Sequence, residues 1–197
     1  MITLPRHIEA TGFECLISCV TMVCMYWRKE KPKMQWGISD NLVSDEWNYF
    51  FKRGLRYVKS SGIPFNSISR YLKSVKFPLR ISLEFLPDMY ALKKLMDFNI
   101  PPIVLYDRYF MLRGIKRAPF HSIITVDATD ELLIAIDPSL GPKFRTSLPK
   151  NDFEGAWRIT RNATIIIAPQ TYKFRRRKVP SVTLEKWVEL KWGSNSE

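Results

Sequence analysis

The longest uncharged apolar stretch of the chain, Cys15 to Trp27, constrains the fold more than any other feature. Nearly every position in it is apolar, so a helix formed by these residues would be hydrophobic on all sides and must be buried. The 13 residues are too few to span a bilayer. The stretch therefore predicts a buried helix at the centre of a globular domain.

Along the rest of the chain, segments with a helical pattern of apolar residues come first and segments with a strand pattern follow. Helical patterns cover residues 43–51 and 66–75, and Pro87 with Asp88 opens a third that runs to Asp97. Alternating or Ile- and Val-rich segments predict strands, at 77–85, 100–106, 120–128, 132–137 and 163–168. This order indicates an α+β fold with the buried N-terminal helix packed on an antiparallel sheet.

Two segments of different character are expected along the chain. Residues 1–170 have the length and apolar content of one domain. Residues 171–197 are basic and less periodic, so we interpret them as a C-terminal appendage, although 184–192 has the pattern of one short amphipathic helix.

The charge of the chain bears on its partners. It carries 31 Lys and Arg against 19 Asp and Glu, a formal net charge of +12, which attracts nucleic acid, anionic lipid or an acidic protein. Part of the excess gathers at residues 108–117 and 173–178. A basic run like the second is most often a solvated tail, so nucleic-acid contact through it is the less favoured interpretation.

The cysteines indicate a reducing compartment. Cys15, Cys19 and Cys24 are the only cysteines, and residues four or nine apart on one helix cannot form a disulfide. Glu9 and Glu14 precede the apolar stretch, which no secretory signal allows. We therefore expect a cytoplasmic protein with no membrane span. The chain has no zinc-type ligand spacing and no glycine-rich phosphate loop, so we expect no metal and no cofactor.

Three residues have the types and places of a nucleophilic site. Cys15 begins the predicted helix, where the helix dipole and unpaired N–H groups favour a thiolate, whereas the other two cysteines fall in later turns and suit the core. His121, one of only two histidines, begins a strand, and Asp137 ends the next. If these strands pair about residue 129, His121 and Asp137 lie opposite each other, as a carboxylate that orients an imidazole requires.

Each of these residues also has an ordinary structural interpretation. A cysteine in an apolar helix usually packs in the core, a strand-end histidine is often structural, and Asp-Pro commonly opens a turn. The ordered spacing of all three favours the catalytic interpretation.

At these residues the sequence resembles the bacteriocin-processing, double-glycine type of papain-like cysteine peptidases and their stand-alone relatives. The likeness runs in chain order over roughly residues 5–168. It is carried by these segments: Glu9-x5-Cys15-Leu16, Pro101-Pro102-Ile103-Val104, His121-Ser122-Ile123-Ile124, Asp137-Pro138 and Phe153-x3-Trp157. The resemblance implies a papain-like fold and a peptide or protein substrate.

The resemblance also implies residue roles. Cys15 would be the nucleophile, His121 the general base and acid, and Asp137 the residue that orients the histidine. The family has a glutamine donor to the oxyanion six residues before the cysteine and a glycine after it, where this chain has Glu9 and Leu16. An ionised carboxylate cannot donate a hydrogen bond, and facing an oxyanion it would repel the charge.

The sequence therefore predicts a cysteine peptidase or related amide hydrolase that works through an acyl-enzyme. Arg113, Lys116 and Arg117 lie just before the histidine in sequence, and if they border the cleft they favour acidic residues in the substrate. Two alternatives stay open: a catalytically weakened binding module for an acidic protein or nucleic acid, and acyl transfer to an amine by the same three residues.

Overall fold

A computed structural model of the chain describes residues 1–4, 14–28, 52–53, 56, 65–74, 79–114, 120–143 and 145–169. Its helices are α1 (Cys15–Trp27), α3 (Phe65–Ser74), α4 (Met89–Asp97), α5 (Arg108–Arg113) and α6 (Lys150–Ile159), with a 3-10 helix η2 (Pro138–Lys143). Its strands are β1 (Leu79–Phe85), β2 (Ile103–Tyr106), β3 (His121–Ala128), β4 (Leu132–Ile136), β5 (Arg145–Pro149) and β6 (Ala163–Pro169).

The described strands form one antiparallel sheet in the order β1-β6-β2-β3-β4-β5. Strands β3 and β4 form a hairpin, and β2 joins β3 to β6 in the middle of the sheet. The expected α+β fold with an antiparallel sheet is therefore confirmed.

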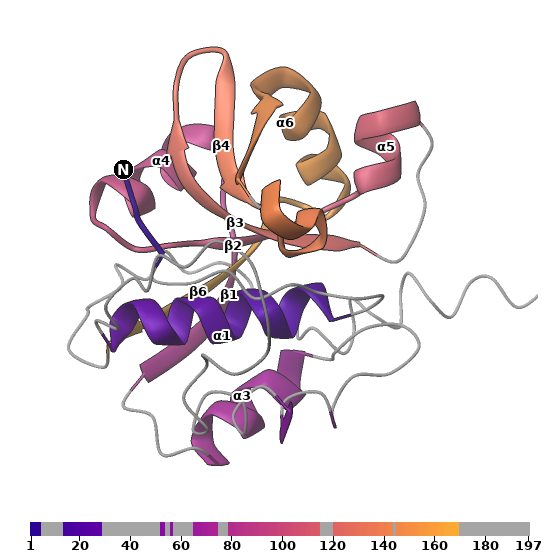
Figure 1. Cartoon of the computed structure of the whole chain (residues 1–197). Coiled ribbons are helices and arrows are strands. Elements are labelled where there is room, and N and C mark those ends of the chain that lie inside the picture. The colour runs from indigo at the N-terminus through magenta and orange to yellow at the C-terminus, as the bar shows by residue number, and fades with distance from the viewer. Residues whose placement is uncertain are drawn as a thin grey trace, which may run out of the picture.

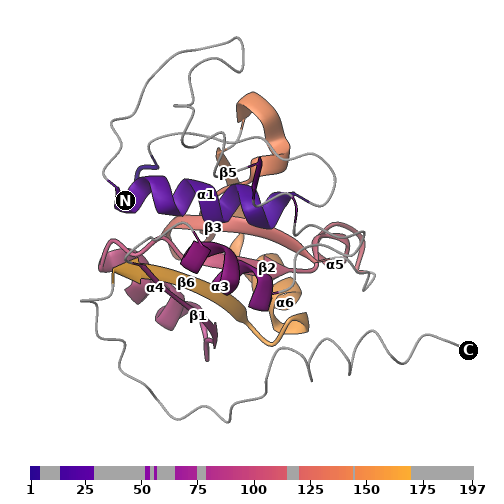
Figure 2. The same ribbon diagram turned by 90° about the horizontal axis from the view of Figure 1, so that it is seen from below.

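Helix α1 is buried along most of its length, as its apolar sequence requires. Every residue from Cys15 to Met25 is buried, and the helix packs mainly on β3 and also on β6. In Figure 1 it crosses below the sheet, with α3 on its other side, and Figure 2 shows it stretched along β3. The start of α1 is thus held against the start of β3.

Helices α5 and α6 cover a different part of the sheet. Helix α6 packs on β2, β4 and β5, and α5 packs on α6 (Figure 1). Trp157 and Phe153 of α6 have no exposed surface and stack at 5.9 Å between ring centroids. The hydrophobic packing of α6 therefore holds the segment where the chain leaves β2 and enters α5.

The predicted elements agree with the structure over most of the chain that it describes. The expected helices 15–27, 66–75 and 88–97 are α1, α3 and α4, and the five expected strands are β1, β2, β3, β4 and β6. Helices α5 and α6 and strand β5 were not predicted; α5 and β5 are short, and both pack on α6. The helix expected at 43–51 and the appendage 171–197 lie outside the described residues.

In the part of the chain that the structure describes, no helix has the length and apolar character needed to cross a membrane.

Candidate active site

The thiol of Cys15 lies at the first residue of α1. The side chain is 8% exposed, and the residue before it, Glu14, accepts from the Ser18 N–H at 3.0 Å as the first hydrogen bond of the helix. The N–H groups ahead of Ser18 have no acceptor within the helix. Cys15 therefore lies at the positive end of the α1 dipole, as the sequence predicted.

His121 and Asp137 come together from the β3–β4 hairpin, but not in the expected register. Ile124 pairs with Ile136 and Thr125 with Ala135, with a bulge before Asp127. The hairpin therefore turns between Asp130 and Glu131, and the expectation that residues 121 and 137 lie directly opposite is wrong. Asp137 follows the last paired residue of β4, and its side chain reaches His121 diagonally, within the range of cross-strand neighbours.

The three predicted residues are connected by hydrogen bonds. His121 Nε2 lies 2.7 Å from Asp137 Oδ1, and the imidazole also hydrogen bonds to the Cys15 thiol. A carboxylate only accepts, so Nε2 donates to Asp137. Nδ1 is then the ring nitrogen that can hydrogen bond with the sulfur of Cys15. The Tyr106 ring packs against the imidazole in a T-shaped arrangement, with 5.7 Å between the ring centroids.

Each member of this group has a shifted pKa. Burial opposes the thiolate of Cys15, but hydrogen bonds and the charge of His121, with hydrogen bonds from Ser122, lower the pKa of the thiol below its usual value. Burial disfavours the imidazolium, but Asp137 and Cys15 together raise the pKa of His121 to about 9. Burial also disfavours the Asp137 carboxylate, yet His121 and Ser139 lower its pKa to about 2. These shifts favour the charged forms: the thiolate of Cys15 over its thiol, and the imidazolium and carboxylate of His121 and Asp137 near neutral pH.

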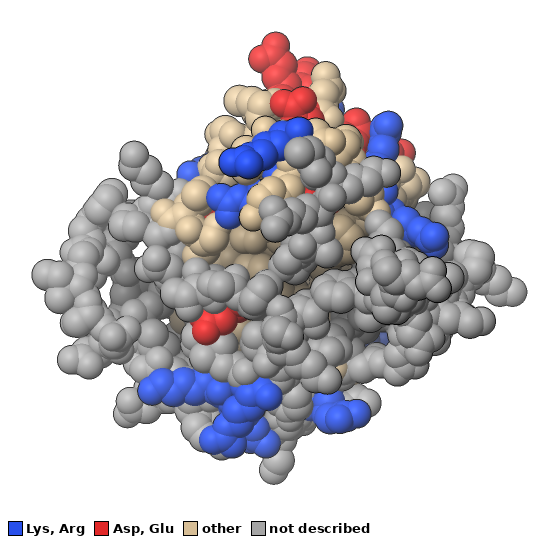
Figure 3. Space-filling view, turned by 90° about the vertical axis from the view of Figure 1, so that its right-hand side faces the viewer, with Lys and Arg blue, Asp and Glu red and all other residues tan. Residues whose placement is uncertain are grey.

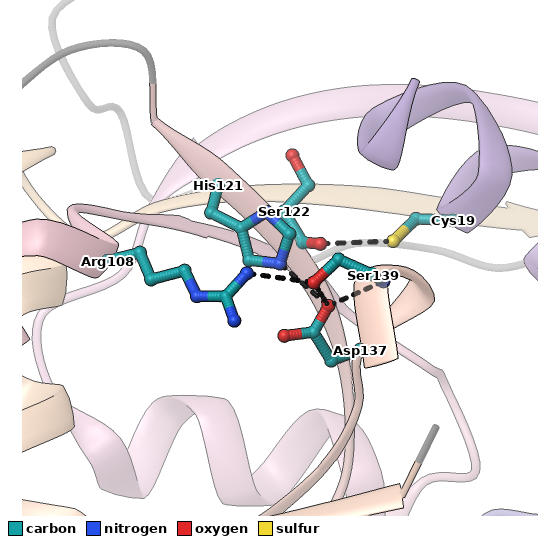
Figure 4. Close-up of polar contacts among 6 residues, drawn as sticks. All are labelled: Cys19, Arg108, His121, Ser122, Asp137 and Ser139. Atoms are coloured by element: carbon teal, nitrogen blue, oxygen red, sulfur yellow. Dashed lines mark hydrogen bonds and ion pairs between the residues drawn. The ribbon is translucent and has the colours of Figure 1, made fainter. Parts of the chain in front are cut away.

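The other two cysteines have the opposite electrostatics. Burial raises the pKa of Cys19 and Cys24, and both have no exposed surface. Cys19 Sγ lies 3.5 Å from the Ser122 carbonyl oxygen, to which it donates (Figure 4). All three cysteines are free, and Cys15 alone has an environment that favours a thiolate.

Two residues that the sequence analysis missed, Ser139 and Arg108, form hydrogen bonds that lead to the Asp137 carboxylate. The Ser139 N–H and hydroxyl both donate to Asp137 Oδ1, at 2.8 and 2.7 Å, and Arg108 Nη1 donates to Ser139 Oγ at 2.8 Å. The serine could have been found, because an Asp side chain that accepts from the N–H two residues later is a common turn signal. Arg108 could not, because its partner lies 31 residues away in another element.

Of the remaining predicted residues, only part is described. Arg113 is exposed in the last turn of α5, and Leu16 is buried. Glu9, Lys116 and Arg117 lie outside the described residues. Figure 3 views the molecule from the side of α5, where Lys and Arg side chains are spread over the described surface and most of the visible acidic ones lie toward its upper edge.

The described residues also include no cluster of three or more His, Cys, Asp or Glu side chains arranged to hold a metal ion.

No protein-family model matches the chain, and no curated protein matches it in sequence. Its fold does match solved structures. A C39-like peptidase from Bacillus anthracis has a TM-score of 0.59 at 11% identity, over 85% of this chain and 96% of that one. The peptidase domain of Streptococcus ComA, a bifunctional ABC transporter of a quorum-sensing pathway, has a TM-score of 0.55 at 18% identity, over 83% and 97%.

A third structure is a double glycine motif protease from an AMS/PCAT transporter in complex with its leader peptide. It has a TM-score of 0.54 at 14% identity, over 85% of this chain and 93% of that chain. The resemblance stated from the sequence motifs is therefore confirmed at the level of the fold: the chain has the papain-like fold of C39 peptidase structures.

Proposed function

We propose that the protein is a cysteine peptidase or related amide hydrolase that acts on peptides through an acyl-enzyme. The observation that carries the proposal is the hydrogen-bonded chain from Cys15 through His121 to Asp137. A thiol of lowered pKa beside an imidazole that a carboxylate orients is the arrangement that nucleophilic catalysis requires. The peptidase fold supports the same conclusion.

The reaction would proceed in two halves. The Cys15 thiolate attacks the carbonyl carbon of a peptide bond, a C–S bond forms, and the carbonyl electron pair moves to oxygen. As the oxyanion collapses, the C–N bond breaks and the His121 imidazolium gives its proton to the leaving amine. Neutral His121 then takes a proton from water, whose oxygen attacks the thioester. The C–S bond breaks, and the site returns to thiolate and imidazolium.

Asp137 has two roles in this scheme. Its hydrogen bond to Nε2 keeps the imidazole turned toward the sulfur, and its negative charge stabilises the imidazolium. The charge is itself stabilised by its donors, because an unpaired carboxylate that is only 3% exposed would be costly.

The oxyanion would be held by backbone N–H groups at the start of α1. These groups precede the first intrahelical hydrogen bond and lie at the positive end of the dipole. Glu9 stands where the resembled family has a glutamine donor. A missing donor of this kind lowers acyl-transfer rates by roughly a hundred- to a thousandfold, so we expect slow turnover of generic peptides.

The substrate class is proposed from two sources. The structural neighbour in complex with a leader peptide supports peptide binding on this fold. The basic residues Arg113, Lys116 and Arg117, close to His121 in sequence, favour acidic side chains in that peptide. The division into a peptidase domain (1–170) and a basic appendage (171–197), and a cytoplasmic location, remain part of the proposal.

The alternative function is a binding module on the same fold. Glu9 favours it, because a carboxylate facing the oxyanion would disable hydrolysis while the basic surface could still hold an acidic protein or nucleic acid. Acyl transfer to an amine would use the same three residues and differ only in the acceptor.

One experiment separates these functions. The protein is incubated with a peptide carrying an electrophilic carbonyl or epoxide, and the modified cysteine is mapped by mass spectrometry. Selective labelling of Cys15, with Cys19 and Cys24 unmodified, is expected of the peptidase. Cys15→Ser is the control, and uniform inertness of all three cysteines would favour the binding module. Peptide mixtures with and without an added amine then distinguish hydrolysis from transfer.

A further inference from the structure

A serine hydroxyl links the candidate site to a basic residue on another element. Arg108 Nη1 donates to Ser139 Oγ at 2.8 Å, and Ser139 Oγ donates to Asp137 Oδ1 at 2.7 Å. Figure 4 shows Arg108 and Cys19 approaching the His121–Asp137 pair from opposite sides. Arg108 begins α5 and Ser139 lies in η2, so the link joins two elements that are distant in sequence.

The direction of these hydrogen bonds follows from the chemistry of the groups. A guanidinium only donates and a carboxylate only accepts. The hydroxyl has one hydrogen, so a hydroxyl that accepts from Arg108 is left with that hydrogen for Asp137. With the Ser139 N–H at 2.8 Å and His121 Nε2 at 2.7 Å, three donors meet at Oδ1. The rotamer of the carboxylate is thereby fixed.

Helix α5 is anchored so that Arg108 begins it in a defined place. Asp107, which is 1% exposed, caps the helix by accepting from the Phe110 N–H at 2.9 Å, and its own N–H donates to the Ala156 carbonyl at 3.2 Å. Phe110 packs on α6 so closely that a Cβ at Gly155 would lie 3.3 Å from its ring. The guanidinium therefore comes from a helix whose position is set by core packing.

We propose that Arg108 is a positioning residue for the hydrolysis: acting through Ser139, it holds the Asp137 carboxylate in the orientation that keeps His121 directed at Cys15. The inference rests on the proposed function, since it concerns the same site. It assigns to Arg108 a role in the protein's own hydrogen-bond network instead of in substrate charge recognition.

Other titratable groups lie around the His121–Asp137 pair and could contribute to the pH dependence of Cys15 alkylation. Tyr106 faces it from β2, and Cys15 and Cys19 face it from α1. Burial raises the pKa of Tyr106 and of Cys19, so both stay neutral below pH 9. The pH profile below pH 9 therefore reports on Cys15 and His121 and not on Tyr106 or Cys19.

The test is the rate of Cys15 alkylation by iodoacetamide between pH 5 and 9, in the full-length protein, with the modified residue mapped by mass spectrometry. Iodoacetamide is small and uncharged, so a substrate-binding role of Arg108 does not affect the reaction. We expect Ser139→Ala to lower the rate at pH 6 about tenfold, because the lost hydroxyl no longer holds the carboxylate that orients His121. Arg108→Met should lower it roughly three- to tenfold, and Arg108→Lys should restore part of the loss.

The double variant tests whether Arg108 acts through Ser139. Arg108→Met added to Ser139→Ala should cause no further loss, because the serine that transmits the effect is already gone. Losses that multiply in the double variant would overturn the proposal, and so would an Arg108→Met profile identical to wild type. Arg80→Met, which removes an exposed arginine from β1, is the matched charge control and should match wild type.

The outcomes also separate this inference from the proposed function. A wild-type Cys15 that reacts no faster at pH 6 than a free thiol would refute the catalytic pair itself. A reactive wild type with unaffected Ser139→Ala and Arg108→Met variants would refute only the positioning role. Should Arg108→Met lower the melting temperature, Arg108→Lys and Ser139→Ala still decide the question, because both keep the side-chain volume nearly unchanged.

Discussion

Replacing Asp137 by asparagine should change the pH dependence of the site more than its rate at acidic pH. The amide oxygen can still accept hydrogen bonds from Ser139 and His121, so the side chain can keep its orientation, but the negative charge is lost. That charge and hydrogen bond contribute much of the rise in the pKa of His121, from 6.5 to about 9. Without them the pKa of His121 falls toward 6.5.

The magnitude follows from the protonated fraction of the imidazole. At pH 8 a group with a pKa of about 9 is about 90% protonated, and one with the ordinary pKa of 6.5 is about 3% protonated. At pH 6 the two fractions are about 100% and about 75%. The variant should therefore lose up to about thirtyfold at pH 8 and less than about twofold at pH 6 through protonation alone. Cys15 also raises the pKa of His121 and still does so in the variant, so thirtyfold is an upper limit.

The assay is inactivation by a peptidyl epoxide, since ring opening needs both a thiolate and a proton from the imidazolium. Asp130→Asn, in the exposed turn between β3 and β4, is the control for a lost carboxylate and should follow the wild-type profile. A loss in Asp137→Asn that is the same at pH 6 and pH 8 would refute the reasoning, because it would mean that the carboxylate does not set the protonation of His121.

Three further predictions concern other parts of the chain. Glu9→Gln should raise hydrolysis by supplying a donor, and Glu9→Ala should help less because it only removes repulsion; equal rates in all three forms would mean that Glu9 does not face the oxyanion. Truncation after Gln170 should leave a soluble protein with an unchanged melting temperature, and insoluble or unfolded protein would show that the appendage docks on the domain. Trp157→Ala should cost about 3–5 kcal/mol of unfolding free energy in urea denaturation, since Trp157 is fully buried and stacks on Phe153. A cost below 1 kcal/mol would contradict that packing.

Local pattern was sufficient for the elements that bury a continuous apolar run. The helix Cys15–Trp27 has the expected bounds, because a segment apolar on every side has no alternative to burial. The strands with Ile and Val clusters follow for the same reason. Helix α5 did not follow, because its six residues are too few to show a helical period, and the contact of Phe110 with α6 is formed only in the folded chain.

The candidate site was predictable in its residue types and less so in its geometry. Chain order and the helix and strand starts brought out Cys15, His121 and Asp137, and the structure brings the three together. The expected pairing of residue 121 with residue 137 was wrong, because the bulge in β3 and the position of the turn are set by packing of the hairpin. In the sequence Arg108 stands out only as part of a basic stretch, because its partner Ser139 is 31 residues away and becomes its neighbour only in the folded chain.

The pH dependence of Cys15 alkylation in wild type and His121→Ala shows whether Cys15 and His121 form a thiolate–imidazolium pair. The lowered pKa of Cys15 depends on the hydrogen bond and charge of His121. If the pair forms, wild-type Cys15 still reacts at pH values well below 8, and His121→Ala reacts only as the thiol approaches its ordinary pKa of about 8.5 or above. Equal reactivity of the two proteins across the whole pH range would contradict it.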